Sequence, residues 1–200
     1  MINIPYSYRL GALAFLAIAM VLYERLFRRS SHEREWEYGF LFFAGILGAF
    51  YGAVNDAVTS ELSPVYFTVG KGLAGTGTIK YQAMMLGAQA GFSAAVVTCA
   101  IWQFLLRRIS ARQRCALIFK HLWIPFSLAP LLGLVFPLFS NNSDPLLFAN
   151  QLRGIILAED LPGFLAVWWV HLGTYTGLIA GVAIGIHRTR RCSRRHSSQS

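Results

Sequence analysis

A chain of 200 residues that is 55% hydrophobic and only 14% charged does not have the composition of a soluble domain, in which about 25% of residues are charged. Its net charge of +9 suits a nucleic-acid-binding protein at first sight, but the basic residues stand in short clusters between long apolar runs. That placement argues against nucleic acid and favours a lipid bilayer as the partner, because arginines beside apolar runs face anionic headgroups.

Five apolar runs are long enough, or nearly so, to cross a hydrocarbon core of about 30 Å, which takes about 20 helical residues. In chain order they cover residues 10–27, 38–57, 82–106, 117–139 and 164–187. The short linkers leave no room for a separate soluble domain. The sequence therefore predicts an all-α fold, a single polytopic bundle of five transmembrane helices over residues 1–187, followed by a basic and disordered tail at 188–200.

The first run has about the length of a signal-peptide core. Only Arg9 precedes it as a basic residue, and no small-residue cleavage site stands before Glu24 and Arg25. The first run is therefore interpreted as a retained membrane anchor.

Basic clusters follow the first, third and fifth runs, whereas the other two linkers hold few basic residues. The clusters are Arg25, Arg28, Arg29 and Arg34, then Arg107, Arg108, Arg112 and Arg114, then Arg188, Arg190, Arg191, Arg194 and Arg195. The other linkers contain only Lys71, Lys80 and Arg153. By the positive-inside rule, this alternation predicts an N-terminus outside the cell and a cytosolic C-terminus.

Polar residues close the second run at what the orientation makes its outer end. Asn55, Asp56 and Thr59 stand there, and Ser63-Pro64 follows in a loop. Because polar groups at membrane depth are costly, they are candidate functional residues. In the alternative interpretation Asp56 meets interfacial water, or caps the following turn with Asn55 and Thr59, and Ser63 caps a short helix.

The fourth linker contains the signals of a short helix. Ser143 or Asp144 can cap it, and Pro145 can take its first position. We expect a helix lying in the outer interface and ending near Glu159 and Asp160.

Glycines recur every four residues in three of the runs, which places them along one face of each helix. They are Gly173, Gly177, Gly181 and Gly185 in the fifth run, Gly48 and Gly52 in the second, and Gly87 and Gly91 in the third. Such faces let helices approach closely, so the second, third and fifth spans are predicted to form a tight core. The ladder of the fifth run could instead mediate a homodimer.

His171 lies about 10 Å inside the fifth run from its outer end, and Thr174 and Tyr175 share its side of the helix. A neutral histidine bonded to a neighbouring hydroxyl or carbonyl is one interpretation. In the other, Asp56 and His171 converge in an outward-facing cavity, where a carboxylate and an imidazole can bind a divalent metal or pass a proton. A heme bound through His171 is a further possibility.

Two motifs carry a family resemblance: Tyr51-Gly52-x-x-Asn55-Asp56-x-Val58-Thr59-x-x-Leu62-Ser63-Pro64-x-Tyr66-Phe67, and His171-x-x-Thr174-Tyr175-x-Gly177. They resemble a signature of small uncharacterised bacterial integral membrane proteins. That signature has glutamate where this chain has Val65, so no role for a carboxylate carries over to that position. The resemblance implies a bacterial inner-membrane location and a pairing of Asp56 with His171, but no activity.

Three functions remain open from the sequence. The leading hypothesis is a small transporter, channel or cation-handling protein, with Asp56 and His171 as ligands or proton carriers and Asn55, Thr59 and Tyr175 as their hydrogen-bond partners. The alternative is a non-catalytic accessory or assembly subunit that docks another membrane protein through the glycine ladder. The third is a membrane enzyme acting on lipid or quinone, with Asp56 as general base and His171 as acid.

Overall fold

The computed structural model describes residues 33–73, 78–139 and 154–197, together with isolated positions 15, 18, 19, 22, 23 and 26 of the first segment. Of the predicted first span at 10–27, only these six positions are described, and each of them is helical, so the span as a whole stays a prediction. Most of the helix expected in the fourth linker lies outside the described residues, and residues 154–160 form turns.

Four long helices make up the described part of the chain, and no strand occurs in it. They are α2 (Glu33–Leu62), α3 (Ile79–Leu105), α4 (Ala111–Val135) and α6 (Leu161–Ser197), with a short π-helical turn η1 (Tyr66–Gly70) and a 3₁₀ turn η2 (Phe136–Phe139). All four long helices are apolar and long enough to cross a membrane. The all-α prediction is confirmed, and four of the five predicted spans correspond to these helices.

Most of the helices are longer than the apolar runs of the sequence, because polar residues that flank those runs are helical as well. Helix α4 begins with Ser110 as its cap, whose hydroxyl accepts a hydrogen bond from the Gln113 amide at 3.4 Å. The Ala111 amide donates to the Glu33 carboxylate at 2.9 Å, which satisfies another free amide of the first turn. Hydropathy detects the membrane-facing middle of a helix and misses such ends.

Backbone-to-backbone contact joins α2 to α3. A Cβ atom added to Gly52 would lie 2.0 Å from the Gly87 carbonyl oxygen, and one added to Gly48 would lie 2.4 Å from that of Gly91. No side chain larger than hydrogen fits at these positions without separating the helices. Close approach of this kind gives van der Waals contact where lipid supplies no hydrophobic drive between helices.

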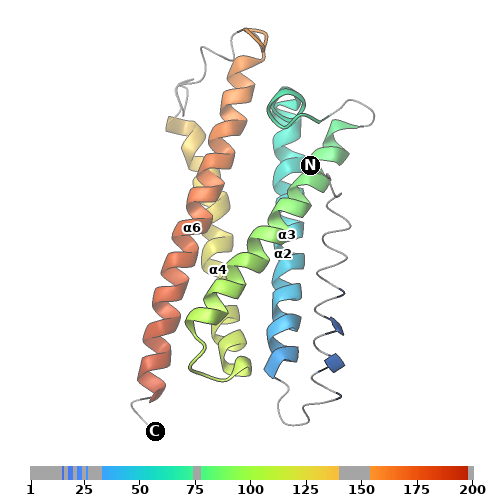
Figure 1. Cartoon of the computed structure of the whole chain (residues 1–200). Helices are drawn as coiled ribbons and strands as arrows, with labels where there is room; N and C mark the ends of the chain where they lie inside the picture. Colours follow the sequence, from blue (N-terminus) through green and yellow to red (C-terminus); the bar gives the residue numbers. More distant parts are fainter. Residues whose placement is uncertain are drawn as a thin grey trace.

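The glycine ladder of α6 packs on α4. Cβ atoms added to Gly173 and Gly177 would lie 2.2 Å and 2.3 Å from the carbonyl oxygens of Leu132 and Leu128, and one added to Gly181 would lie 2.4 Å from Pro125 Cα. The predicted contact between the second and third spans is confirmed, but the prediction that the fifth span packs closely on them is wrong, because α6 packs mainly on α4. The described helices form two hairpin-like pairs, α2 with α3 and α4 with α6 (Figure 1). The four-residue spacing of the glycines predicts that another helix packs closely against them, but it does not identify that helix.

Two apolar clusters join the pairs, one near each end of the bundle. The first surrounds Phe67 of η1 and Phe164 of α6, and the second surrounds Trp102 of α3 and Ile118 of α4. Beside the second cluster, the Trp102 indole donates to the Thr189 hydroxyl at 2.9 Å.

That hydrogen bond holds the C-terminal part of α6, where a disordered tail was expected from residue 188 onward. Helix α6 instead continues to Ser197, and Thr189 is fully buried. The basic composition predicted disorder because it offers no apolar surface, whereas the structure has helix over these residues.

Replacement of Gly52 by alanine tests the α2–α3 contact. We expect Gly52→Ala to lower the free energy of unfolding by about 1–3 kcal/mol, because the added methyl group overpacks a backbone contact. Gly39→Ala is the matched control on the same helix, since a Cβ there meets nothing within 4 Å and alanine favours helix. The measurement is thermal unfolding in mild detergent; equal stability of the two variants would contradict the contact.

Candidate functional site

Asp56 of α2 and His171 of α6 lie side by side, although 115 positions separate them in the chain. The His171 Nε2 atom is 3.9 Å from the Asp56 Oδ1 atom, and both residues are more than 90% buried. This distance is too long for a direct hydrogen bond, yet short enough for electrostatic attraction when both groups are charged. The two helix pairs thus contribute one ionisable group each.

Asn55, Thr59 and Tyr175 were expected to hydrogen-bond to Asp56 or His171, and the structure gives each of them a different contact. Asn55 Nδ2 donates to Asp56 Oδ1 at 3.1 Å, as a neighbouring amide can. The Thr59 hydroxyl instead donates to the Asn55 backbone carbonyl at 2.9 Å, so it does not bind the carboxylate. A threonine inside a helix finds that carbonyl one turn back without moving its backbone. Tyr175 lies beside His171 with its ring centroid 6.1 Å away, and half of its surface is exposed.

Aromatic rings enclose the imidazole. Tyr66 stacks on His171 with a centroid distance of 5.0 Å and an interplanar angle of 13°, and Phe67 meets it edge-on at 6.2 Å. The Lys71 ammonium lies 5.5 Å from the centroid of the Tyr66 ring. Burial raises the pKa of the Tyr66 phenol above its ordinary value, so the ring remains neutral at physiological pH.

Tyr66 and Phe67 follow Ser63-Pro64 in the loop after α2, and they belong to the first sequence motif without an expected role of their own. The Ser63 hydroxyl accepts a hydrogen bond from the Tyr66 amide at 3.3 Å and starts the turn η1. This turn directs both rings back over the bundle, toward α6. Two adjacent aromatic residues directly after a Ser-Pro turn were the available signal, but contact with His171 depends on tertiary packing.

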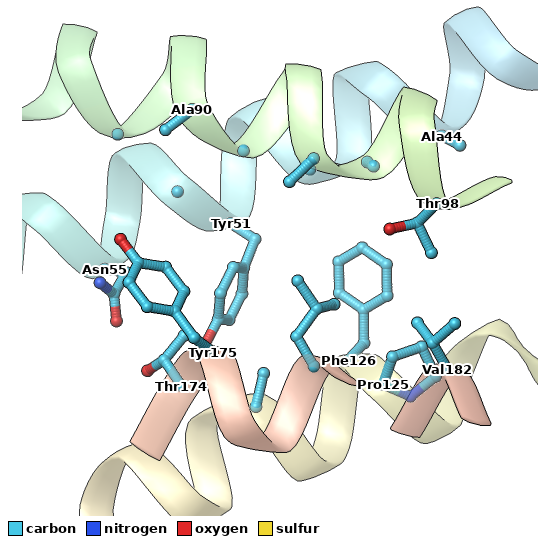
Figure 2. Close-up of a pocket in the computed structure, with 18 of the residues that line it drawn as sticks. Ala44, Tyr51, Asn55, Ala90, Thr98, Pro125, Phe126, Thr174, Tyr175 and Val182 are labelled. Carbon is cyan, nitrogen blue, oxygen red and sulfur yellow. The ribbon is translucent and has the colours of Figure 1, made fainter. Parts of the chain in front are cut away.

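A cavity of about 140 Å³ extends from the polar pair between the two helix pairs. Glycines and alanines of α2 and α3 line one side, whereas Phe126 of α4 and Tyr175, Leu178 and Val182 of α6 line the other (Figure 2). Tyr51 projects between them, and Figure 2 shows its hydroxyl beside Thr174. The two hydroxyls are close enough to interact with each other, although neither has a hydrogen bond of good geometry.

The described residues do not form a complete metal site. Among the described residues, no three of His, Cys, Asp and Glu cluster in a way that could hold a metal ion. Asp56 and His171 therefore provide two ligands, whereas protein zinc sites use three or four. The cavity, at about 140 Å³, is also too small for a heme, because a cavity of about 150 Å³ accommodates a single benzene ring, whereas a porphyrin joins four pyrrole rings into one large macrocycle.

A double-mutant cycle tests the pairing. We expect the effects of Asp56→Asn and His171→Gln on the free energy of unfolding to be non-additive by about 0.5 kcal/mol or more, as for residues in contact. Glu61→Gln combined with His171→Gln is the matched control, because Glu61 is exposed and pairs with Lys80. Additivity of the Asp56 cycle within about 0.3 kcal/mol would contradict the observed proximity.

Comparisons with known proteins add no constraint on this site. No protein family matches the sequence, and neither a curated protein nor a solved structure matches it. The resemblance to small bacterial membrane proteins thus remains an expectation from the motifs, and the argument for function depends on geometry.

Proposed function

We propose that this chain is a small transport protein of a bacterial inner membrane, with five spans, that moves protons or a small cation through the Asp56–His171 pair. The observation that carries the proposal is the pair itself: two ionisable groups, buried at 3.9 Å, with His171 Nε2 bound to no other group. Intramembrane carboxylates and histidines of this kind mark proton and ion pathways.

The separation of the pair suits proton transfer. A gap of 3.9 Å is longer than a hydrogen bond but closes with a small shift of either side chain. Each helix pair holds one partner, so relative movement of the pairs makes or breaks the connection. The carboxylate and imidazole can therefore exchange a proton in one arrangement and release it in another.

The accessory-subunit alternative loses its main support. The glycine ladder of α6 was the expected docking surface for another membrane protein, but α4 of the same chain occupies it at Gly173, Gly177 and Gly181. The ladder is therefore explained by intramolecular packing.

The distribution of charge supports the proposed orientation. One end of the bundle contains the first residues of α2 and α4 and the last residues of α3 and α6 (Figure 1). The described arginines gather there: Arg34, Arg107, Arg108, Arg112, Arg114, Arg188, Arg190 and Arg191. Asp56 lies toward the opposite end, next to the turn η1. The positive-inside rule makes the arginine end cytosolic and the Asp56 end external.

Cysteine labelling tests the topology. In intact spheroplasts, a membrane-impermeant maleimide is expected to label Lys71→Cys and Ser7→Cys, each in a Cys192→Ser background, because both positions lie outside in the five-span arrangement. Native Cys192 is expected to react only after lysis. Labelling of Lys71→Cys without Ser7→Cys would reduce the count to four spans, and labelling of Cys192 in intact cells would reverse the orientation.

Proton flux tests the activity. Purified protein in liposomes that contain a pH-sensitive dye is expected to carry protons when a potassium diffusion potential is applied. Asp56→Asn and His171→Gln are each expected to lower the flux about tenfold, a barrier increase of about 1.4 kcal/mol, since each removes one proton carrier. Glu61→Gln removes an exposed carboxylate and should conduct like the wild type. Undiminished flux in both site variants, or no flux in the wild type, would refute proton transport.

A further inference from the structure

Unpartnered polar atoms cluster around one cavity. Among the described residues, four buried side-chain atoms have no hydrogen-bond partner, and three of them belong to residues that line this cavity: Tyr51 Oη, His171 Nε2 and Thr174 Oγ1. A buried polar group without a partner costs about 1–3 kcal/mol, and folded proteins contain few of them. The Tyr51 and Thr174 hydroxyls lie beside each other and can partner one another, whereas His171 Nε2 has no hydroxyl partner. A ligand with a hydrogen-bonding atom would therefore complete the site at His171 and bring the two hydroxyls into good geometry.

The walls of the cavity favour a flat, apolar group. The side formed by α2 and α3 includes Gly48, Gly52 and Gly91, which have no side chain, and Ala90 and Ala94, which have only a methyl group. The opposite side is formed by larger apolar side chains of α4 and α6 (Figure 2). Tyr51 projects from α2 into the cavity, and we call the space that remains beside its ring, between the small residues and the apolar side chains, the slot.

The size of the slot limits its occupant to about one ring. Its volume is about 140 Å³. An apolar protein cavity of about 150 Å³ binds one benzene molecule, so a single six-membered ring is the matching group.

The side of the cavity between α3 and α6 offers a route from the bilayer. The two helices meet near the cytosolic end, where Gly185 packs on Trp102 and Thr189 accepts its hydrogen bond. Farther out, Ala90 and Ala94 of α3 and Tyr175 of α6 line the cavity and are exposed within the described part of the protein. In a membrane, this side faces the acyl chains.

We propose that the cavity binds a membrane-dissolved molecule whose head is a single six-membered ring bearing a hydroxyl or carbonyl oxygen. The ring occupies the slot, and its oxygen bonds to the unpartnered groups of Thr174, Tyr51 and His171. An apolar tail extends between α3 and α6 into the bilayer. An acyl chain would leave the three polar atoms unpaired, and a bare cation would meet mainly apolar walls. The inference goes beyond proton transport: it shares His171 with the proposed proton pathway, but it is argued from the cavity and its polar atoms.

Two probes of similar shape test whether the cavity recognises the ring alone or also the oxygen that the ring bears. The probes are 4-propylphenol and propylbenzene, which share their shape except for the hydroxyl group. The measurement is the dissociation constant, obtained from the rise in unfolding temperature of the detergent-solubilised protein as each probe is titrated. We expect the wild type to bind 4-propylphenol about tenfold more tightly, which corresponds to about 1.4 kcal/mol for the hydroxyl.

Two variants assign the binding to the cavity. Thr174→Val keeps the shape of the side chain and removes the unpartnered hydroxyl, so it should remove most of the preference for 4-propylphenol while leaving propylbenzene binding unchanged. Ala94→Phe fills the exposed side of the slot and should weaken both probes at least tenfold. Val97→Phe is its matched control, because Val97 is exposed on the same helix and does not line the cavity.

Equal affinity of the wild type for the two probes would overturn the inference, as would unchanged binding to Ala94→Phe. Tyr51→Phe provides a second hydroxyl deletion if Thr174→Val does not fold, and it should also reduce the preference for 4-propylphenol. Proton flux in liposomes is independent of this result. Flux without probe selectivity would refute only the ligand site, and probe selectivity without flux would refute only proton transport.

Discussion

Direct backbone contact between helices is the constraint on which the rest of this structure depends. Lipid tails are as apolar as leucine, so two helices in a bilayer gain little from burying apolar side chains against each other. Gly52 against Gly87 and Gly177 against Leu128 bring backbones together at distances that exclude even a methyl group. Two tightly packed helix pairs result, and both the Asp56–His171 pair and the cavity lie where these helix pairs face each other.

Tight contact within each pair leaves an incompletely filled space between them. The glycines that allow α2 and α3 to meet also line one side of the cavity, where they add no side chain to fill it. Clusters around Phe67 at one end and Trp102 at the other hold the pairs together, so the middle does not collapse. Asp56 and His171 lie at the edge of this space, where each pair supplies one member. The position of this polar pair inside an apolar bundle therefore follows from the way in which the helices pack in pairs.

The sequence predicted the helical class, four of the helices and the residues that now meet, because these depend on local hydrophobic length and on depth in the membrane. Asp56 and His171 were singled out since each stands near the same end of its run. Helix partners were not predictable from glycine spacing, because a smooth face fits any other smooth face. The stacking of Tyr66 on His171 depends on a turn after Ser63 that brings a loop back over the bundle. The role of Thr59 was misjudged because a backbone carbonyl one turn away competes for its hydroxyl.

The length of α6 has a mechanical consequence. Its 37 residues extend about 55 Å, which exceeds the hydrocarbon core by nearly a factor of two. His171 and Arg190 belong to this one helix, about 28 Å apart along its axis. The Trp102–Thr189 hydrogen bond fixes the rotation of the helix near its basic end. Because the helix is continuous, a tilt that displaces the imidazole would pivot about this hydrogen bond and change the direction of the basic segment beyond it.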